Sequence, residues 1–323
     1  MRAAICHDFD SPLAIDDVPT PAPAAGEVAV RVEACGVNFV DGLIVSGRYQ
    51  LKPQLPHIPG FEIAGVVTAV GTAAMAFKPG DAVFATCGLD GGGYAQYVAL
   101  PEDRVFHRPA HLSAGQAATF VQSYCTALFA LTRRIQIQPG QHLLTLGASG
   151  GVGRAALDVG TALGARVIAA ASSRERLDYC RALQPAATID YSRADLKTAA
   201  RAASGGGVDV VLDPLGGDHT EPALRALTDD GALLVVGFAA GTIPRLPANQ
   251  ILLRNRRVIG VDWGGWRSRH PNLQAELMAE LRALLEQGKL QPAEPTAAPL
   301  HEVNEVLRTV NGRGVVGKYV LTP

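Results

Sequence analysis

The chain has 323 residues, of which 48% are hydrophobic and 18% charged, and its formal net charge is −1 at pH 7. This length allows two domains, and this composition is that of a well-buried globular protein. A charge so close to zero gives no support to binding of nucleic acid or of an anionic membrane surface. The one basic cluster, at Arg254, Arg256 and Arg257, is interpreted as the solvated start of a strand.

The N-terminus, the apolar stretches and the cysteines favour a cytoplasmic protein. Residues 1–8 contain no apolar core of a signal peptide, and the apolar stretch 232–240 is too short to span a bilayer. No two cysteines form a C-x-x-C pair, and their odd, dispersed number argues against a disulfide framework. The five cysteines are Cys6, Cys35, Cys87, Cys125 and Cys180.

The chain up to about residue 125 is expected to be mostly β structure. Residues 27–34 alternate apolar and polar side chains, as a half-buried strand does, and 62–71, 81–85 and 94–99 are expected to be further strands. Turns rich in glycine and proline separate them. Many short strands with such turns predict a small barrel-like β domain.

From Ser113 onward the pattern changes to α/β. Ser113 and Gln116 form a capping-box pattern that predicts a helix start, and further helices are expected over 123–134 and 274–287. Helices that alternate with buried strands predict a parallel sheet. The strands expected here are 143–146, 165–171, 208–213, 232–237, 257–261 and 314–321.

Residues 142–164 carry the pattern of a dinucleotide-binding unit. An apolar strand is followed by a glycine-rich turn and then by a helical pattern that stops at Gly164. Such a turn lets the backbone approach a pyrophosphate, and the helix N-terminus supplies N–H groups and a positive dipole end. The match to G-x-G-x-x-G is incomplete because Ala148 takes the first glycine position, so a turn without a ligand is the alternative. The residues expected to bind the pyrophosphate are Gly150, Gly151, Val152 and Gly153.

The end of strand 165–171 indicates which cofactor is bound. About 20 residues after the glycine turn, an NAD site carries an Asp or Glu for the ribose 2′-hydroxyl. Here Ser172, Ser173 and Arg176 stand at the strand tip, which suits a 2′-phosphate. Glu175 is assigned to the start of the next helix, where an acid favours the helix dipole. NADP(H) is therefore preferred to NAD(H).

Six short segments together make the chain resemble a known family. They are GVNFVD (36–41), GRY (47–49), PGFEIAG (59–65), GASGGVG (147–153), DPLGG (213–217) and GFA (237–239). Over nearly its whole length the chain is similar to the zinc-independent quinone oxidoreductases, the zeta-crystallin-like branch of the medium-chain dehydrogenase/reductase superfamily. The resemblance implies an α/β fold, with a GroES-like β-rich catalytic domain over 1–124 that is completed by 264–323. A Rossmann domain with a doubly wound parallel sheet is implied for 125–263, with the active site between the two.

The zinc-dependent relatives of this family carry a cysteine where this chain has Asn38, and a His-Glu pair where it has Phe61 and Glu62. Zinc requires three or four ligands in tight geometry. Cys35 and His57 lie nearby in the sequence but are assigned to packing. The chain is therefore expected to bind no metal.

The resemblance implies hydride transfer from NADPH to a quinone or a related α,β-unsaturated carbonyl. Tyr49 matches the family's substrate-side tyrosine, and the alternative is a loop aromatic packed on the domain edge. Asn38 is expected to hydrogen-bond the nicotinamide ribose or the substrate, and the alternative is a cap on the helix that starts there. Asp41, three residues on, is expected to be structural.

Further cofactor contacts are implied by the resemblance. Tyr191 and Arg313 match residues near the adenosine phosphate, with core packing and a solvent-exposed turn as their alternatives. Gly237 and Phe238 lie at the C-terminal end of a strand, where ligands sit in such sheets. Thr126 is expected on the nicotinamide side.

Two other functions stay open at this point. One is a reductase of acyl-CoA esters or lipid-derived enals, which needs a wide basic channel. The other is a cofactor-binding protein without turnover, used structurally or to bind RNA. The neutral charge and the absence of interleaved aromatic and basic residues argue against RNA.

A homodimer is expected to form by pairing of sheet edges. Strand 257–261 comes last in the Rossmann segment, is apolar and β-branched, and has no interior proline, so its edge invites pairing. The arginines before it could instead guard a monomeric edge. Pairing is favoured because these arginines stand beside the strand and not within it.

Overall fold

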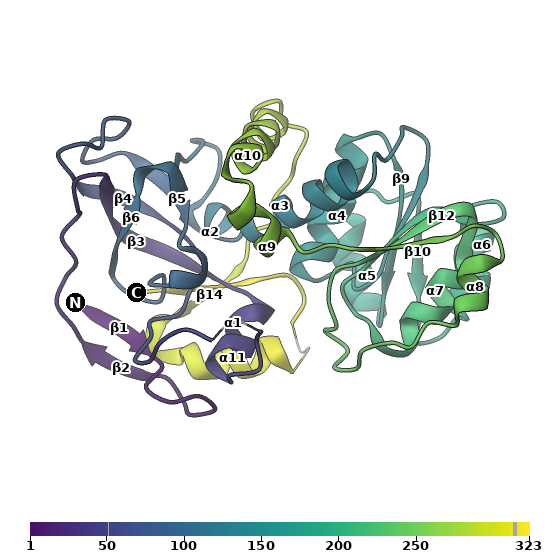
Figure 1. Ribbon diagram of the computed structural model, residues 1–323, viewed down its shortest axis with the longest axis horizontal. Coiled ribbons are helices and arrows are strands. Elements are labelled where there is room, and N and C mark those ends of the chain that lie inside the picture. The colour runs from purple at the N-terminus through teal and green to yellow at the C-terminus, as the bar shows by residue number, and fades with distance from the viewer. Residues whose placement is uncertain (51, 313–314) are drawn as a thin grey trace. The chain divides into compact units, whose positions relative to one another are not determined.

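The computed structural model describes residues 1–50, 52–312 and 315–323. Within it the chain forms two compact units (Figure 1). Unit 1 contains residues 1–122 and 292–323, and unit 2 contains residues 123–291. Unit 1 is therefore built from both ends of the chain, whereas unit 2 is one continuous segment.

Unit 1 is organised on a seven-stranded, mostly antiparallel sheet, which confirms the expected β-rich domain. The strand order is β14-β15-β3-β4-β5-β7, and β6 also pairs with β3. These strands are β3 (Glu27–Val37), β4 (Glu62–Val70), β5 (Ala82–Thr86), β6 (Tyr97–Pro101), β7 (Val105–His107), β14 (Thr296–Pro299) and β15 (Tyr319–Thr322). The other elements are the hairpin of β1 (Arg2–Ile5) and β2 (Ala14–Asp17), the helices α1 (Phe39–Val45), α2 (Ala114–Ala118) and α11 (Val303–Asn311), and the 3₁₀ turns Gly88–Asp90, Glu102–Arg104 and Leu300–Glu302.

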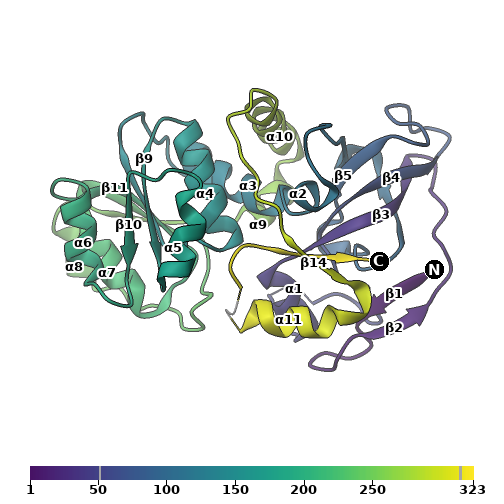
Figure 2. The ribbon, with the colours of Figure 1, turned by 180° about the vertical axis from the view of Figure 1, so that it is seen from behind.

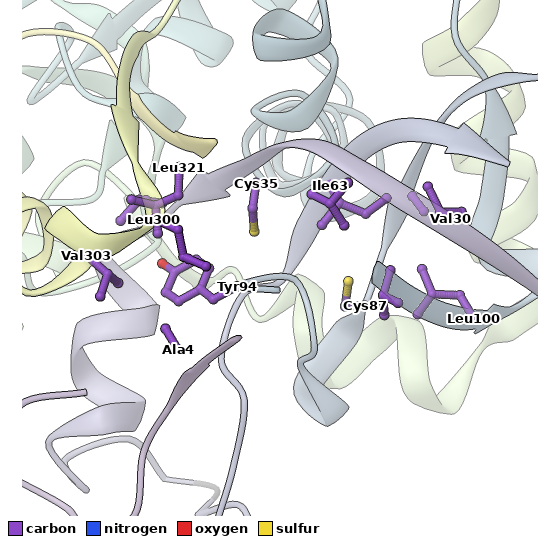
Figure 3. Packing of buried hydrophobic residues seen from close by; sticks show 14 of the residues in the cluster. Ala4, Val30, Cys35, Ile63, Cys87, Tyr94, Leu100, Leu300, Val303 and Leu321 are labelled. Carbon is purple, nitrogen blue, oxygen red and sulfur yellow. The ribbon is translucent and has the colours of Figure 1, made fainter. Parts of the chain in front are cut away.

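The core of unit 1 joins the two ends of the chain. Alternation along β3 turns Val28 and Val30 inward, where both are fully buried. In Figure 3, Cys35 of β3 lies in one cluster with Leu300 and Leu321 from the C-terminal segment. Helix α11 packs against α1 (Figure 2). The first 122 residues therefore need the last segment to complete their core.

Unit 2 contains a six-stranded parallel sheet in the order β10-β9-β8-β11-β12-β13. The strands are β8 (His142–Thr145), β9 (Arg166–Ala171), β10 (Ala187–Asp190), β11 (Val208–Asp213), β12 (Leu227–Val235) and β13 (Arg257–Gly260). Helices α4 (Gly151–Ala162) and α5 (Arg174–Arg181) cover one face, and α6 (Leu196–Ala203), α7 (Thr220–Ala226) and α8 (Ala248–Leu252) the other (Figures 1 and 2). The unit also holds most of α3 (Val121–Phe129), a π-helical turn (Ala130–Arg134), the 3₁₀ turn Gly217–His219, α9 (Trp263–Arg269) and α10 (Pro271–Glu286).

The strand order of unit 2 reverses at β8, whose neighbours are β9 on one side and β11 on the other. In open parallel sheets, ligands bind beyond the carboxyl ends of the strands at such a reversal. The glycine turn that follows β8 lies at this point of the sheet.

The division of the chain differs from the expected one after residue 263. Residues 264–291 belong to unit 2 and not to the first domain. The reason is the apolar face of α10, where Leu277, Met278 and Leu281 are buried. The sulfur atoms of Met278 and of Cys125 in α3 are 3.2 Å apart within this unit.

Two local interpretations also need correction. The last strand begins only at Tyr319, because Gly317 adopts a positive φ of 84° that a strand does not allow. Arg256 is not solvated, since it is 6% exposed. Its guanidinium donates to the carbonyl oxygens of Gln250 at 3.0 Å and Leu227 at 3.2 Å, so it ties β12 to the segment before β13.

Among the described helices, none has both the length and the apolar character needed to cross a membrane.

Candidate functional site

Three neighbouring strands of unit 1 bring polar residues to one end of the sheet. Asn38 directly follows β3, Glu62 opens β4, and Lys318 precedes β15. The pairing register explains this meeting, because β3 lies between the other two strands. Gly36 of β3 pairs with Glu62, and Val37 pairs with the residue after Lys318. Lys318 and Asn38 are 280 positions apart in the sequence, so only the sheet brings them together.

These residues form a buried hydrogen-bonded cluster. Nδ2 of Asn38 donates to Oε1 of Glu62 at 3.1 Å, and the Lys318 ammonium donates to Oδ1 of Asn38. Nζ of Lys318 is 3.4 Å from Oε1 of Glu62. The second carboxylate oxygen accepts from the backbone N–H of Gln122 at 2.9 Å. Glu62 is 1% exposed, so these partners replace the water that its charge has lost.

Asp41 adds a second buried carboxyl group beside this cluster. Its Oδ2 accepts from the backbone N–H of Asn38 at 2.7 Å, which gives it the structural role expected at the start of α1. Among the described residues, neither Oδ1 of Asp41 nor the hydroxyl of Tyr94 has hydrogen-bond geometry to a partner. Burial raises the pKa of Asp41 to about 7, against the opposing effects of the Asn38 N–H, the Lys318 charge and the nearby Tyr94 hydroxyl.

The two predicted catalytic residues lie at opposite ends of α1. Asn38 precedes the helix, and Tyr49 follows it with its N–H donating to Leu43 at 3.0 Å. A helix of seven residues is about 10 Å long at ~1.5 Å per residue. Asn38 is the N-cap residue of α1 and forms a capping box with Asp41. Its carboxamide nitrogen also donates to Glu62, so the side chain links the start of the helix to β4.

The residues at or near the zinc-ligand positions of unit 1 are buried. Cys35 is fully buried in the core cluster, and Phe61 is buried. The backbone of His57 exchanges hydrogen bonds with Cys6, at 2.8 and 3.0 Å. In residues 1–50, 52–312 and 315–323, no three His, Cys, Asp or Glu side chains form a group that could hold a metal ion.

In unit 2 the glycine turn has the geometry of an anion cradle. Gly150 is the N-cap of the 12-residue helix α4 and brings no side chain to its N-terminus. A Cβ on Gly153 would lie 2.2 Å from the carbonyl oxygen of Gly147, so only glycine lets the helix pack on the turn. Ala148 is tolerated because the left-handed residue is Gly147, with φ 55°.

The residues predicted for the adenosine phosphate gather beyond β9. Ser173 is the N-cap of α5 and accepts from the N–H of Arg176 at 3.3 Å. The Arg176 guanidinium reaches back to the hydroxyl of Ser149 in the glycine turn, at 3.3 Å. Tyr191 donates its N–H to Ala171 at 3.1 Å, which places it beside the tip of β9 and next to Ser172. Glu175 is exposed in the first turn of α5, as expected.

The remaining predicted cofactor residues are more scattered. Gly237 and Phe238 follow β12, and Phe238 is 38% exposed. Thr126 is buried in α3. Arg313 lies outside the described residues.

Several residues of these sites were missed in the sequence. Lys318 was missed although it is a lone cation in an apolar C-terminal stretch, and Glu62 was considered only for zinc. In unit 2, His219 was missed, and its ring lies 4.5 Å from that of Tyr191. Asp213 was quoted within DPLGG without a role, and its carboxylate accepts from Leu215, Gly216 and Thr220.

Comparison with known proteins gives matches in both units. A model of the alcohol dehydrogenase GroES-like domain matches residues 24–110, and a model of the zinc-binding dehydrogenases matches residues 151–280. Quinone oxidoreductase-like protein 2 of Bos taurus is 38% identical over 99% of this chain and 92% of its own length. Quinone oxidoreductase of Homo sapiens is 33% identical over 99% of this chain and 97% of its own length. The solved quinone oxidoreductase of Thermus thermophilus, also determined as its NADPH complex, is 34% identical, has a TM-score of 0.87 and covers 100% of both chains.

Proposed function

Because the chain belongs to the zinc-independent quinone oxidoreductases of the medium-chain dehydrogenase/reductase superfamily, we propose that it reduces a quinone or a related α,β-unsaturated carbonyl with NADPH. The observation that carries this proposal is the full-length identity of 38% to a quinone oxidoreductase-like protein. Unit 1 is proposed as the GroES-like catalytic domain, and unit 2 as the NADP(H)-binding domain.

The glycine turn after β8 fits a dinucleotide. Gly150, the N-cap of α4, has no side chain that would block a phosphate, and the N-terminus of α4 carries the positive end of the helix dipole. When bound, NADPH supplies the hydride. We assign the pyrophosphate to Gly150, Gly151, Val152 and Gly153, and the 2′-phosphate to Ser172, Ser173, Arg176 and Tyr191. Thr126, Gly237, Phe238 and Arg313 are proposed as the further cofactor contacts.

At the substrate, the proposed work of the protein is to bind and polarise a carbonyl oxygen. Hydride addition leaves negative charge on that oxygen, so a hydrogen-bond donor beside it lowers the barrier. Asn38 and Tyr49 are the proposed residues on the substrate side. The two stand at opposite ends of α1, so we assign the oxygen to Asn38 and the pocket wall to Tyr49.

Steady-state reduction of 1,4-benzoquinone by NADPH tests the proposed function. We expect turnover that depends on both substrates. NADPH binding without turnover of any quinone or enone would support the cofactor-binding protein without catalysis. A much higher kcat/KM for an enoyl-CoA than for benzoquinone would support the reductase of acyl-CoA esters.

Cofactor preference is tested by Arg176→Glu. The tip of β9 carries hydroxyls and Arg176 where an NAD site carries an acid. We expect the variant to bind NADPH more weakly, by about 10-fold or more for one lost charge-assisted contact, and to bind NADH as before. Equal affinity for both cofactors before and after the change would refute the assignment.

We further propose a cytoplasmic homodimer. All five cysteines are free and buried, as in proteins of reducing compartments. β13 is the edge strand of the sheet, and its residues Arg257, Val258 and Gly260 are exposed. Arg257 therefore lies within the strand and not beside it, while Arg254 and Arg256 precede it. Sedimentation at micromolar concentration should show a dimer, and Ile259→Pro should give a monomer because it disrupts the edge. A monomeric parent protein would refute the dimer, and a dimer that survives the substitution would place the contact elsewhere.

A further inference from the structure

The buried cluster of unit 1 fixes the orientation of one amide group. Asn38 has a carboxamide oxygen that only accepts and a nitrogen that only donates. An ammonium has donors and no acceptor, so the atom that Lys318 contacts must be Oδ1. The carboxylate of Glu62 only accepts, so the atom that faces it must be Nδ2.

Both neighbours of Asn38 therefore demand the same arrangement. A flipped amide would place NH₂ against the ammonium of Lys318 and oxygen against the carboxylate of Glu62. In a cluster this buried, each of those contacts leaves polar groups unpaired, which destabilises the flipped arrangement. Lys318 and Glu62, whose Nζ and Oε1 atoms are 3.4 Å apart, thus hold the amide of Asn38 in one orientation. We call this charge pair the frame.

The frame determines which hydrogen-bonding groups of Asn38 can still bind a ligand. Its oxygen is engaged by Lys318, and one of its two N–H groups is engaged by Glu62. Among the described residues, the second N–H group has no hydrogen-bond partner. Asn38 therefore keeps a hydrogen-bond donor for a ligand, which matches a carbonyl oxygen that gains negative charge.

We propose that Lys318 is a positioning residue, which holds Asn38 as a donor toward the oxygen of the substrate carbonyl. This inference rests on the proposed function and adds a residue to it. Lys318 acts through Asn38, and Glu62 supplies the opposite charge that keeps the ammonium in place. The backbone N–H of Gln122, at 2.9 Å from Oε2, holds the far side of Glu62 and completes the frame.

The kinetics of Lys318 variants test whether Lys318 positions Asn38 or only stabilises the fold. For Lys318→Met we expect kcat with benzoquinone to fall about 10- to 100-fold, as for other partners of a reactive group, with the Kd for NADPH unchanged. Lys318→Arg should retain most of kcat, because a guanidinium is also a pure donor. Asn38→Leu added to Lys318→Met should cause little further loss, since the two residues act as one unit.

Lys78→Met is the matched control in unit 1, because Lys78 is an exposed lysine, and it should leave kcat unchanged. A folded Lys318→Met protein with the parent kcat, or an Arg variant as poor as the Met variant, would overturn the proposal. If Lys318→Met does not fold, the comparison of Lys318→Arg with Lys318→Gln decides. The glutamine side chain offers an acceptor as well as a donor, so we expect it to have the lower kcat of the two.

A readout without turnover keeps this inference separate from the proposed function. In protein labelled with ¹⁵N-asparagine, the Asn38 side-chain signals are assigned by their loss in Asn38→Asp. We expect one amide proton that exchanges slowly with solvent, held by Glu62, and one that exchanges faster. In Lys318→Arg the slow proton should persist. Fast exchange of both protons in the parent protein would overturn the fixed amide even if benzoquinone is reduced. A slow proton in a protein that reduces no carbonyl would refute the proposed function alone.

Discussion

Two buried carboxylates, one in each unit, are stabilised in opposite ways. Glu62 and Asp213 are each 1% exposed. Asp213 accepts from the N–H groups of Leu215 and Gly216 at 2.8 and 2.9 Å, and from the hydroxyl of Thr220 at 2.6 Å. All its partners lie within seven residues of it in the sequence. The partners of Glu62 lie 24, 60 and 256 positions away.

This difference separates a structural turn from the cluster that we propose as part of the substrate site. The partners of Asp213 are two backbone N–H groups and one hydroxyl. They fix the loop that follows β11, and each carboxylate oxygen has a partner. The Glu62 cluster uses side chains from three chain segments, including a full positive charge, and we propose that its free amide proton binds a ligand. A buried pair of charges is weak evidence of stability by itself, and we propose that this pair is kept for the amide that it positions.

The largest expected effect is on the Asp213 turn. Asp213→Ala leaves two backbone N–H groups and the Thr220 hydroxyl without acceptors, and each buried unpaired group costs about 1–3 kcal/mol. We expect the free energy of unfolding in urea to fall by about 4 kcal/mol. Thr220→Val is the control and should cost about 1 kcal/mol, since it removes one bond and leaves the carboxylate two others. If Asp213→Ala lowers the free energy of unfolding by less than Thr220→Val does, water replaces the carboxylate as the acceptor.

The next effect is on the charged frame. Glu62→Met and Lys318→Met each leave one buried charge unpaired, so each should lower the free energy of unfolding by about 3 kcal/mol. The double variant should lose less than the sum, because no unpaired charge remains. Strict additivity, measured by urea unfolding of the four proteins, would contradict a direct pairing of the two charges.

A smaller effect is expected on the pH dependence of stability. The pKa of Asp41 is about 7 in the folded protein, above its ordinary value of 3.8, so between these values the folded state binds a proton that the unfolded state releases. This contribution to stability is therefore full below the unfolded pKa and is lost as the pH rises toward 7. Asp41→Asn should remove it, while its amide oxygen still accepts from the Asn38 N–H.

The measurement is urea unfolding of both proteins between pH 5.5 and 7.5. In that range the parent should lose up to about 1.4 kcal/mol per pH unit relative to the variant, and the difference should level off at higher pH. Parallel curves for the two proteins would show that Asp41 is ionised throughout.

The smallest effect is expected from chelation. In the Glu62 cluster the positive charge is the ammonium of Lys318, so activity with benzoquinone should be unchanged after dialysis against EDTA. About one tightly held zinc ion per chain, lost together with activity, would contradict this expectation.

The contrast between local and long-range partners explains which features could be predicted from the sequence. The glycine turn, five of the six strands of unit 2 and the capping box of Ser113 with Gln116 are local patterns, and the structure contains them, whereas β10 was not predicted. Asn38 was singled out, but its partner Lys318 was not. Their contact depends on the register of β15 against β3, which no local pattern encodes. The boundary near residue 264 was misplaced for a similar reason, because the packing of α10 on α3 is a long-range contact.

The discontinuity of unit 1 has a consequence during synthesis on the ribosome. Unit 2 is continuous and is complete once residue 291 has emerged, whereas unit 1 waits for β15. Until then the growing chain carries Glu62 and Asp41 without the ammonium of Lys318. We expect stalled nascent chains that are cut near residue 305 and extended by a flexible tether long enough to fill the exit tunnel to show a protease-resistant unit 2 and a digestible N-terminal segment, since domains form as their residues become available. The cluster that we assign to the substrate is thus the last part of the molecule to form.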